Sequence, residues 1–193
     1  MSITESPPVV NVNIRMASQE DLPSLEELYP RVFPDEDLVP LIRDLLALGP
    51  PEVLSLLAED SVRNTVGHII FTVCVVGPNE TSVALLGPLA VTPTRQNQGI
   101  GSALVRRGLQ DLSKMDLAMV LVLGSPDYYC RFGFRQEPYV VPPYPLPPNW
   151  SSAWQSMNLY PNSSSEGRDN KRQQGLVGEL VVPYPWQGKH LWS

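Results

Sequence analysis

The spacing of apolar and polar residues changes several times along the chain, and each spacing predicts a different element. Residues 9–16 (VVNVNIRM) alternate between apolar and polar, which is typical of a half-buried strand. Ser18 is placed to cap a helix with an acidic first turn and leucines at helical spacing, although Pro30 and Pro34 are expected to interrupt it. A second helix is expected over residues 36–48.

Three segments rich in β-branched and other apolar residues come next. They span residues 53–59, 65–76 and 81–91, with short turns between them. Because the connections are short, we expect these segments to form an antiparallel meander of three strands.

A change of period then predicts a crossover. Residues 99–115 have apolar side chains at helical spacing, and residues 117–123 are an uninterrupted apolar run. A strand, a helix and a buried strand make a β-α-β unit, which places residues 81–91 and 117–123 side by side and parallel. The expected fold class is α/β (α+β), with a mostly antiparallel sheet that contains one parallel pair and is flanked by helices.

The remainder of the chain is punctuated by proline and polar residues. Ser125 and Pro126 are expected to start a short helix, and a strand should begin at residues 132–134. Residues 138–150 are expected to be a stiff loop without regular structure in its middle, since six of the 21 prolines fall within residues 138–148.

Two late strands are expected over residues 154–159 and 176–182. The polar composition of the intervening residues 160–174 predicts a mobile insert, and residues 1–8 are expected to be a flexible N-terminus.

Composition narrows the class of protein. A chain of 193 residues, of which 42% are hydrophobic, suffices for one domain with a full core, so we expect residues 1–193 to form a single domain. A net charge of -6 with 14 lysines and arginines argues against a nucleic-acid partner. There is neither a long apolar run nor a signal-peptide pattern, which predicts a soluble, cytoplasmic protein without a membrane partner.

The cysteines and histidines point to no metal centre. Cys74 and Cys130 lie in apolar or aromatic contexts outside any C-x-x-C pair, and we expect both to be reduced and structural. His68 and His190 are far apart in the sequence, so no metal is expected.

The stretch TRQNQGIGSALVRRGL, residues 94–109, carries the chemistry. A glycine turn that enters a helix presents unpaired N–H groups and the positive end of the helix dipole, which favours an anion such as phosphate. Two common phosphate motifs do not match: the dinucleotide pattern would need glycine at Leu104, and the P-loop would need Gly-Lys-Ser/Thr where Gly101-Ser102-Ala103 stands.

The stretch instead resembles the Q/R-x-x-G-x-G/A motif of the GNAT superfamily of N-acetyltransferases. Residues 129–134 (YCRFGF) resemble the superfamily's second signature, Y-x-x-x-G-F. The sequences of residues 87–91 and 121–134 and of the two late strands are most like its YhbS-like branch. The resemblance implies the acyl-CoA N-acyltransferase fold, in which the fourth and fifth strands are parallel and splay apart.

The resemblance also implies a cofactor site for acetyl-CoA. Its pyrophosphate would lie on the backbone of the turn, where glycine allows close approach. The matching residues are Gln96, Asn97, Gln98, Gly99, Ile100, Gly101 and Ser102. Asn97 stands where the family often has glycine, and asparagine tolerates the positive φ that glycine provides.

The pantetheine arm would insert between the splayed strands and pair with the backbone of Leu89, Ala90 and Val91. Pro88 has no N–H group, which suits a strand that leaves its ladder at this point. Ser125 matches a position that often touches the arm, although an N-cap role is equally compatible, and Arg131 or Arg135 could meet the 3'-phosphate or remain solvated.

For catalysis, the resemblance assigns Tyr129 as the acid that protonates the departing thiolate, with Tyr128 as a weaker candidate and cofactor packing as the alternative. The base is open, because residues 81–91 contain no acidic residue. His68 could serve as a base or could simply be packed in its strand; a chain of waters or a neutral amine would need no residue.

The sequence therefore predicts transfer of an acetyl group from acetyl-CoA to a primary amine of a small molecule or protein, by direct attack in a ternary complex. An acyl-CoA-binding regulatory or partner module without transfer activity is the alternative. The chain is expected to be a monomer or homodimer. Residues 144–150 and 182–192 mix proline with aromatic residues, and we favour a wall of the acceptor pocket over a ligand for another protein.

Overall fold

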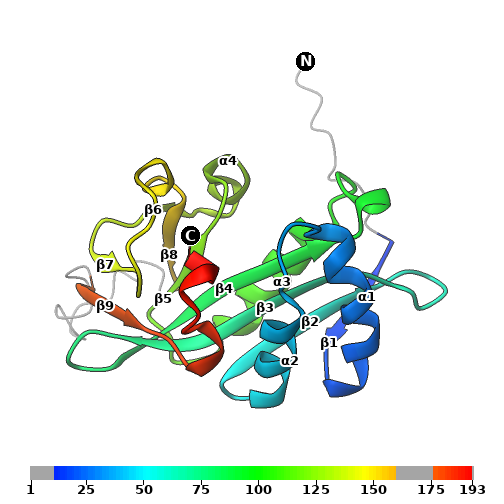
Figure 1. Ribbon diagram of the computed structural model, residues 1–193, viewed down its shortest axis with the longest axis horizontal. Coiled ribbons are helices and arrows are strands. Elements are labelled where there is room, and N and C mark those ends of the chain that lie inside the picture. The colour runs from blue at the N-terminus through cyan, green and yellow to red at the C-terminus, as the bar shows by residue number, and fades with distance from the viewer. Residues whose placement is uncertain (1–10, 160–175, 193) are drawn as a thin grey trace.

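The computed structural model describes residues 11–159 and 176–192 (Figure 1). The segments expected to be flexible or mobile, residues 1–8 and 160–174, lie outside these ranges, as do the first residues of the strand expected over 9–16.

Within the described residues, nine strands join into one mixed sheet whose main path runs β1-β2-β3-β4-β5-β8-β6. β4 and β5 are parallel neighbours, as the crossover predicted. β9 pairs with the end of β3 and, in parallel, with β7. The bounds are β1 (Asn13–Met16), β2 (Val53–Glu59), β3 (Thr65–Val76), β4 (Thr81–Val91), β5 (Met119–Leu123), β6 (Arg135–Gln136), β7 (Val140–Val141), β8 (Trp154–Asn158) and β9 (Gly178–Val181).

Helices cover both faces of the sheet (Figure 1). The helices are α1 (Leu22–Val32), α2 (Val39–Leu48), α3 (Ile100–Leu112) and the short α4 (Pro126–Tyr129). Leucines and isoleucines of α1 and α2 pack on one face of the sheet, and α3 packs on the other. None of the described helices is long and apolar enough to cross a membrane.

The antiparallel meander is confirmed, because β2, β3 and β4 pair in that order with the bounds that the sequence predicted. The expectation that Pro30 interrupts the first helix is wrong: α1 continues through Pro30 to Val32. Pro30 stands in the last turn, where the lost N–H costs one hydrogen bond and few residues follow. The second helix begins at Val39 rather than at residue 36.

The middle of the proline-rich segment, residues 142–147, contains no helix or strand, as predicted. Near its start, however, Val140 and Val141 form β7 and pair with Gly178 and Glu179 of β9. The two valines retain the N–H groups that the surrounding prolines lack. A strand does not begin at Phe132 either, because residues 130–132 form a 3-10 turn before β6.

Candidate active site

The site begins where β4 separates from β5. The last pair between these strands is Leu86 with Val122, while β5 continues to pair with β8 up to Leu123. On its other side β4 contains one extra residue, since Leu86 and Leu89 pair with Phe71 and Ile69 of β3. This bulge contains Pro88, which lacks the N–H group that a ladder would need.

In the part of the chain that the structure describes, the end of β4 therefore has a partner strand on one edge only. It consists of Leu89, Ala90 and Val91. They pair with Ile69, His68 and Gly67 of β3, and among the described residues no strand pairs with their other edge. The side chain of Ala90 is fully buried, whereas those of Leu89 and Val91 are partly exposed. Backbone of this kind is free to pair with an inserted chain.

The glycine turn lies beside this strand end. Asn97 and Gly99 both have positive φ, 60° and 83°. Asn97 therefore adopts the left-handed backbone conformation that asparagine was expected to tolerate at this position. Gly99 caps α3, and Ala103 is the first residue whose N–H bonds back into the helix, to Gly99. The N–H groups of the three residues before Ala103 have no backbone partner within the described residues, which is the usual state of a helix start that binds anions.

The side chains of the two glutamines are used inside the turn. Gln96 donates from Nε2 to the carbonyl of Val91 at 3.1 Å, which ties the turn to the end of β4. Gln98 accepts from Arg95 Nε at 2.8 Å through Oε1. Ile100 is buried in the core under α3. The turn thus leaves its backbone, rather than these side chains, as the group available to a ligand.

Gly101 is the tightest position of the turn. A Cβ atom there would lie 2.6 Å from the hydroxyl oxygen of Tyr128 and 3.5 Å from a methyl group of Val91. Tyr128 also hydrogen-bonds with Ser102, and the Arg131 guanidinium carbon lies 4.7 Å from the centroid of its ring. Burial raises the pKa of Tyr128. Tyr128 therefore belongs to the wall of the glycine turn.

Tyr129 lies deeper, at the end of β5. Its side chain is 8% exposed and packs against Phe134, with ring centroids 5.6 Å apart. Its ring also fills the space over Gly124, where a Cβ atom would lie 2.4 Å away. Burial raises the pKa of Tyr129 well above its ordinary value, so the phenol is protonated throughout the neutral range. Among the described residues its hydroxyl has no hydrogen-bond partner.

The gap between β4 and β5 opens into a cleft with a volume of about 850 Å³. Four parts of the chain wall it beyond the strands: the end of α1 and the start of α2, residues 124–129 after β5, the residues before β8, and the C-terminal segment. Its lining residues are Phe33, Glu36, Leu38, Leu41, Leu85, Leu86, Gly87, Pro88, Leu89, Leu123, Gly124, Ser125, Tyr128, Tyr129, Trp150, Ala153, Trp186, His190, Leu191 and Trp192.

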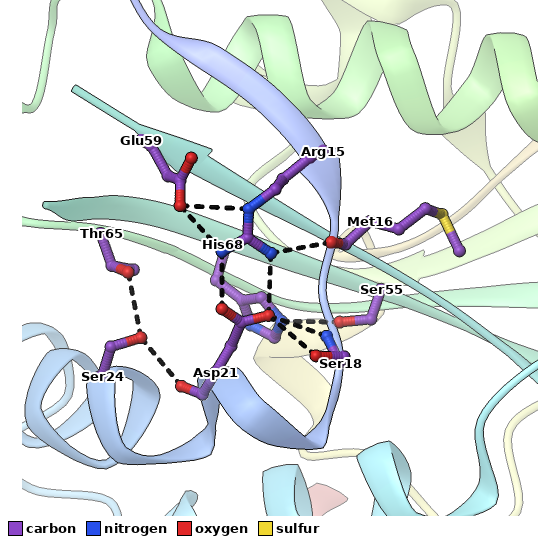
Figure 2. A network of polar contacts seen from close by, with 9 residues as sticks. All are labelled: Arg15, Met16, Ser18, Asp21, Ser24, Ser55, Glu59, Thr65 and His68. Atoms are coloured by element: carbon purple, nitrogen blue, oxygen red, sulfur yellow. Dashed lines mark hydrogen bonds and ion pairs between the residues drawn. The ribbon is translucent and has the colours of Figure 1, made fainter. Parts of the chain in front are cut away.

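His68 is packed in its strand, as one of the two alternatives proposed. It is fully buried, with Nδ1 2.8 Å from the hydroxyl oxygen of Tyr29 and Nε2 2.8 Å from Oγ of Ser55. Burial lowers its pKa to about 3, so the imidazole is neutral and enclosed. Figure 2 shows His68 and Ser55 beside the ion pairs of Arg15 with Asp21 and Glu59. A base that must reach solvent or substrate cannot be this residue.

The remaining predicted positions divide between the site and its surroundings. Ser125 lines the cleft and is also the N-cap residue of α4, so both of its proposed roles remain compatible. Arg135 is exposed on β6. Cys74 and Cys130 are free thiols, the first buried and the second exposed. No cluster of metal-binding side chains occurs within residues 11–159 and 176–192.

Sequence reasoning missed several lining residues. Glu36 and Phe33 come from the connection between α1 and α2, which carried no recognisable motif. The C-terminal segment was flagged by its mixture of proline and aromatic residues, and Trp186, His190 and Trp192 do line the cleft. Nothing in the spacing indicated which of its side chains would face inward.

Comparisons with known proteins agree with this geometry. Residues 13–136 match the model of the acetyltransferase (GNAT) domain. The chain is 31% identical over 159 residues to the uncharacterized N-acetyltransferase YjhQ of Escherichia coli K12, across 78% of this chain and 86% of YjhQ. It is 32% identical over 122 residues to the uncharacterized N-acetyltransferase YhbS of the same strain, across 63% and 72% of the two chains.

Two solved structures are similar over most of their length. The crystal structure of Escherichia coli YhbS in complex with CoA matches with a TM-score of 0.76 and 26% identity over 94% of each chain. A GNAT family acetyltransferase from Brucella melitensis in complex with acetyl-CoA matches with a TM-score of 0.67 and 24% identity, over 91% of this chain and 98% of that one. The expected fold and the resemblance to YhbS-like proteins are confirmed, and the chain belongs to the acetyltransferase (GNAT) domain family.

Proposed function

We propose that the protein transfers an acetyl group from acetyl-CoA to a primary amine of a small molecule or protein, by direct attack in a ternary complex. The observation that carries the proposal is the separation of β4 from β5 at the Gly87-Pro88 bulge, beside a helix start and open to a cleft of about 850 Å³. The CoA and acetyl-CoA in the two similar structures support the same cofactor here.

The turn and the strand end would share the binding of the cofactor. The N–H groups of Ile100, Gly101 and Ser102 are available to the pyrophosphate, and the other turn residues, Gln96 to Gly99, would hold that backbone in place. The free edge of β4 at Leu89–Val91 would pair with the pantetheine amides and polarise the thioester carbonyl. A side chain at residue 101 would displace both Tyr128 and the phosphates.

The transfer exchanges one covalent bond for another and moves, overall, one proton from the neutral amine to the thiolate. The amine nitrogen forms a bond to the acetyl carbon, the carbon–sulfur bond breaks, and the thiolate takes a proton while the nitrogen loses one. Tyr129 suits the role of proton donor, because its buried phenol is protonated at neutral pH and lines the gap between the strands. Tyr128 is the weaker candidate, since its hydroxyl lies against Gly101 and Ser102.

The acceptor must lose its proton before it attacks. β4 contains no acidic residue, and His68 is enclosed, so neither supplies a base. We propose that water in the open cleft carries the proton away or that the amine arrives neutral. The missing strand carboxylate also favours the second candidate function, an acyl-CoA-binding module without transfer activity.

Release of CoA thiol from acetyl-CoA across a panel of amines tests the proposal. Tyr129→Phe is expected to lower kcat by about 100- to 10,000-fold because the proton donor is lost. Tyr139→Phe is the matched control, since Tyr139 is 56% exposed and does not line the cleft. An unchanged rate in Tyr129→Phe would remove its role. CoA binding without turnover on any amine would support the binding module instead.

A further inference from the structure

The acceptor side of the cleft is walled by aromatic rings from separate parts of the chain. Phe33 follows α1, Trp150 precedes β8, and Trp186 and Trp192 lie near the C-terminus. The tip of the Trp186 ring is 3.6 Å from the position that a Cβ atom on Gly87 would occupy. The aromatic wall therefore reaches the bulge at which β4 leaves β5.

The two C-terminal tryptophans turn only carbon surface toward the cleft. Trp186 donates from Nε1 to Oγ1 of Thr72 at 3.0 Å, and Trp192 donates from Nε1 to the carbonyl of Trp186 at 3.0 Å. Their ring centroids are 6.0 Å apart, and the exposed fractions of the two residues are 8% and 2%. Because both indole N–H groups are already used, the small part of these rings that remains accessible from the cleft is apolar.

The formal charge of the cleft lining is of one sign, negative. Glu36 is the one formally charged residue among the described lining residues, and neither lysine nor arginine is present there. Its carboxylate is exposed and makes no hydrogen bond or ion pair within the described residues, whereas Glu26 and Glu27 are each paired with an arginine. The lining thus has an oppositely charged partner for a cation, whereas an anion would meet only neutral donors such as the hydroxyl groups of Ser125 and Tyr129.

We propose that the acceptor is a cationic amine on an aromatic or similarly bulky apolar body that carries no carboxylate, an inference that rests on the proposed transferase function. Ring faces attract an ammonium group and bury an apolar body. The carboxylate of Glu36 adds attraction at the mouth of the cleft. An acceptor with its own carboxylate would lose water there without gaining a lysine or arginine as a partner, and it would be repelled by Glu36.

Calorimetric titration of the CoA-bound protein with three matched ligands tests the proposal. The ligands are 2-phenylethylamine, phenylalaninamide and phenylalanine, which share a phenyl ring and an amine but differ in the carboxyl group. Phenylalanine is expected to bind at least about tenfold more weakly than the other two, because its carboxylate meets no lysine or arginine in the lining.

Substitutions at the mouth of the cleft sharpen the test. Glu36→Gln is expected to weaken 2-phenylethylamine binding by about 2- to 5-fold, the scale of an exposed ion pair. Asp37→Asn is the matched control, because Asp37 is exposed in the same loop but does not line the cleft, and it should bind the amine as the wild type does.

Each outcome decides one of the two proposals. Equal or tighter binding of phenylalanine, or no binding of either aromatic amine, overturns the inference about the acceptor. Thiol release with other acceptors in that case leaves the transferase proposal standing. Conversely, a protein that binds the aromatic amines in this order but releases no thiol with any acceptor keeps the ligand preference of the cleft and loses the transferase proposal.

Discussion

The proposed site has two halves, one for the cofactor and one for the acceptor, which are built from different groups. The proposed cofactor half consists of backbone from one continuous stretch, residues 87–102, in which a bulge, a strand edge and a helix start follow one another. The acceptor half consists of side chains from segments that are far apart in the sequence. A site made of backbone groups is determined by a short local sequence pattern. A site made of side chains depends instead on how the whole fold brings distant segments together.

The largest expected effect is a loss of CoA binding when the proposed cofactor half is disrupted. Gly101→Val adds a Cβ atom that would lie 2.6 Å from the hydroxyl oxygen of Tyr128, and the added side chain would push phosphates off the helix start. A hydrogen bond to a charged group contributes about 1.5–3 kcal/mol, so losing two should weaken CoA binding by about 100-fold or more. Equilibrium dialysis with CoA measures this loss.

Gln98→Ala is the matched control for that change. Its side chain bonds Arg95 within the turn, so its loss should change CoA affinity only mildly. Gly99→Val should also abolish binding, but it adds backbone strain at φ 83°, so Gly101 gives the cleaner test. A larger loss in Gln98→Ala than in Gly101→Val would show that side chains, not backbone, bind the cofactor.

The next effect concerns the floor under the cofactor half, where His68 pairs with Ala90. The pKa of His68 in the folded protein is about 3, below the ordinary histidine value of 6.5, so between these pH values the unfolded chain binds one more proton than the folded chain. Stability is therefore fully present above pH 6.5 and falls as the pH drops, by a slope that approaches about 1.4 kcal/mol per pH unit. Urea unfolding from pH 6.5 to pH 4.5 should show a shallower loss for His68→Gln than for the wild type. Equal slopes would mean that His68 is not neutral in the fold.

The smallest effect concerns the acceptor half. Trp150→Ala removes a half-buried ring that lines the cleft, and it should raise the KM for an aromatic amine by about 2- to 10-fold while leaving CoA affinity unchanged. Tyr184→Ala is the control, because Tyr184 is 76% exposed and lies outside the lining. If both variants behave alike in the thiol-release assay, the aromatic wall does not contact the acceptor.

The features that the sequence predicted correctly are those that depend on local patterns, as in the proposed cofactor half. Periodicity predicted the bounds of β2, β3 and β4, because alternating and β-branched runs are local signals. Local sequence signals also predicted the turn at residues 96–102 and allowed the positive φ of Asn97. The position of Tyr129 followed from a short motif in the same way. Each of these depends on neighbours within a few residues.

What the sequence missed depends on tertiary contacts. The persistence of α1 past Pro30 and the pairing of Val140 with β9 come from packing and from a partner strand distant in the chain. Glu36 lines the cleft because the loop between α1 and α2 places it there. Trp186 and Trp192 both line the cleft and belong to the core, so deleting residues 185–193 would remove core packing together with any acceptor contact.

The most direct test of the central claim follows backbone amides by NMR while CoA is titrated into the protein. If the cofactor is bound by the backbone of the turn and the strand edge, the largest shifts should fall on the amides of residues 98–102 and 89–91, and those of residues 33–38 and 186–192 should change little. Large shifts in the latter segments with an unchanged turn would contradict the account.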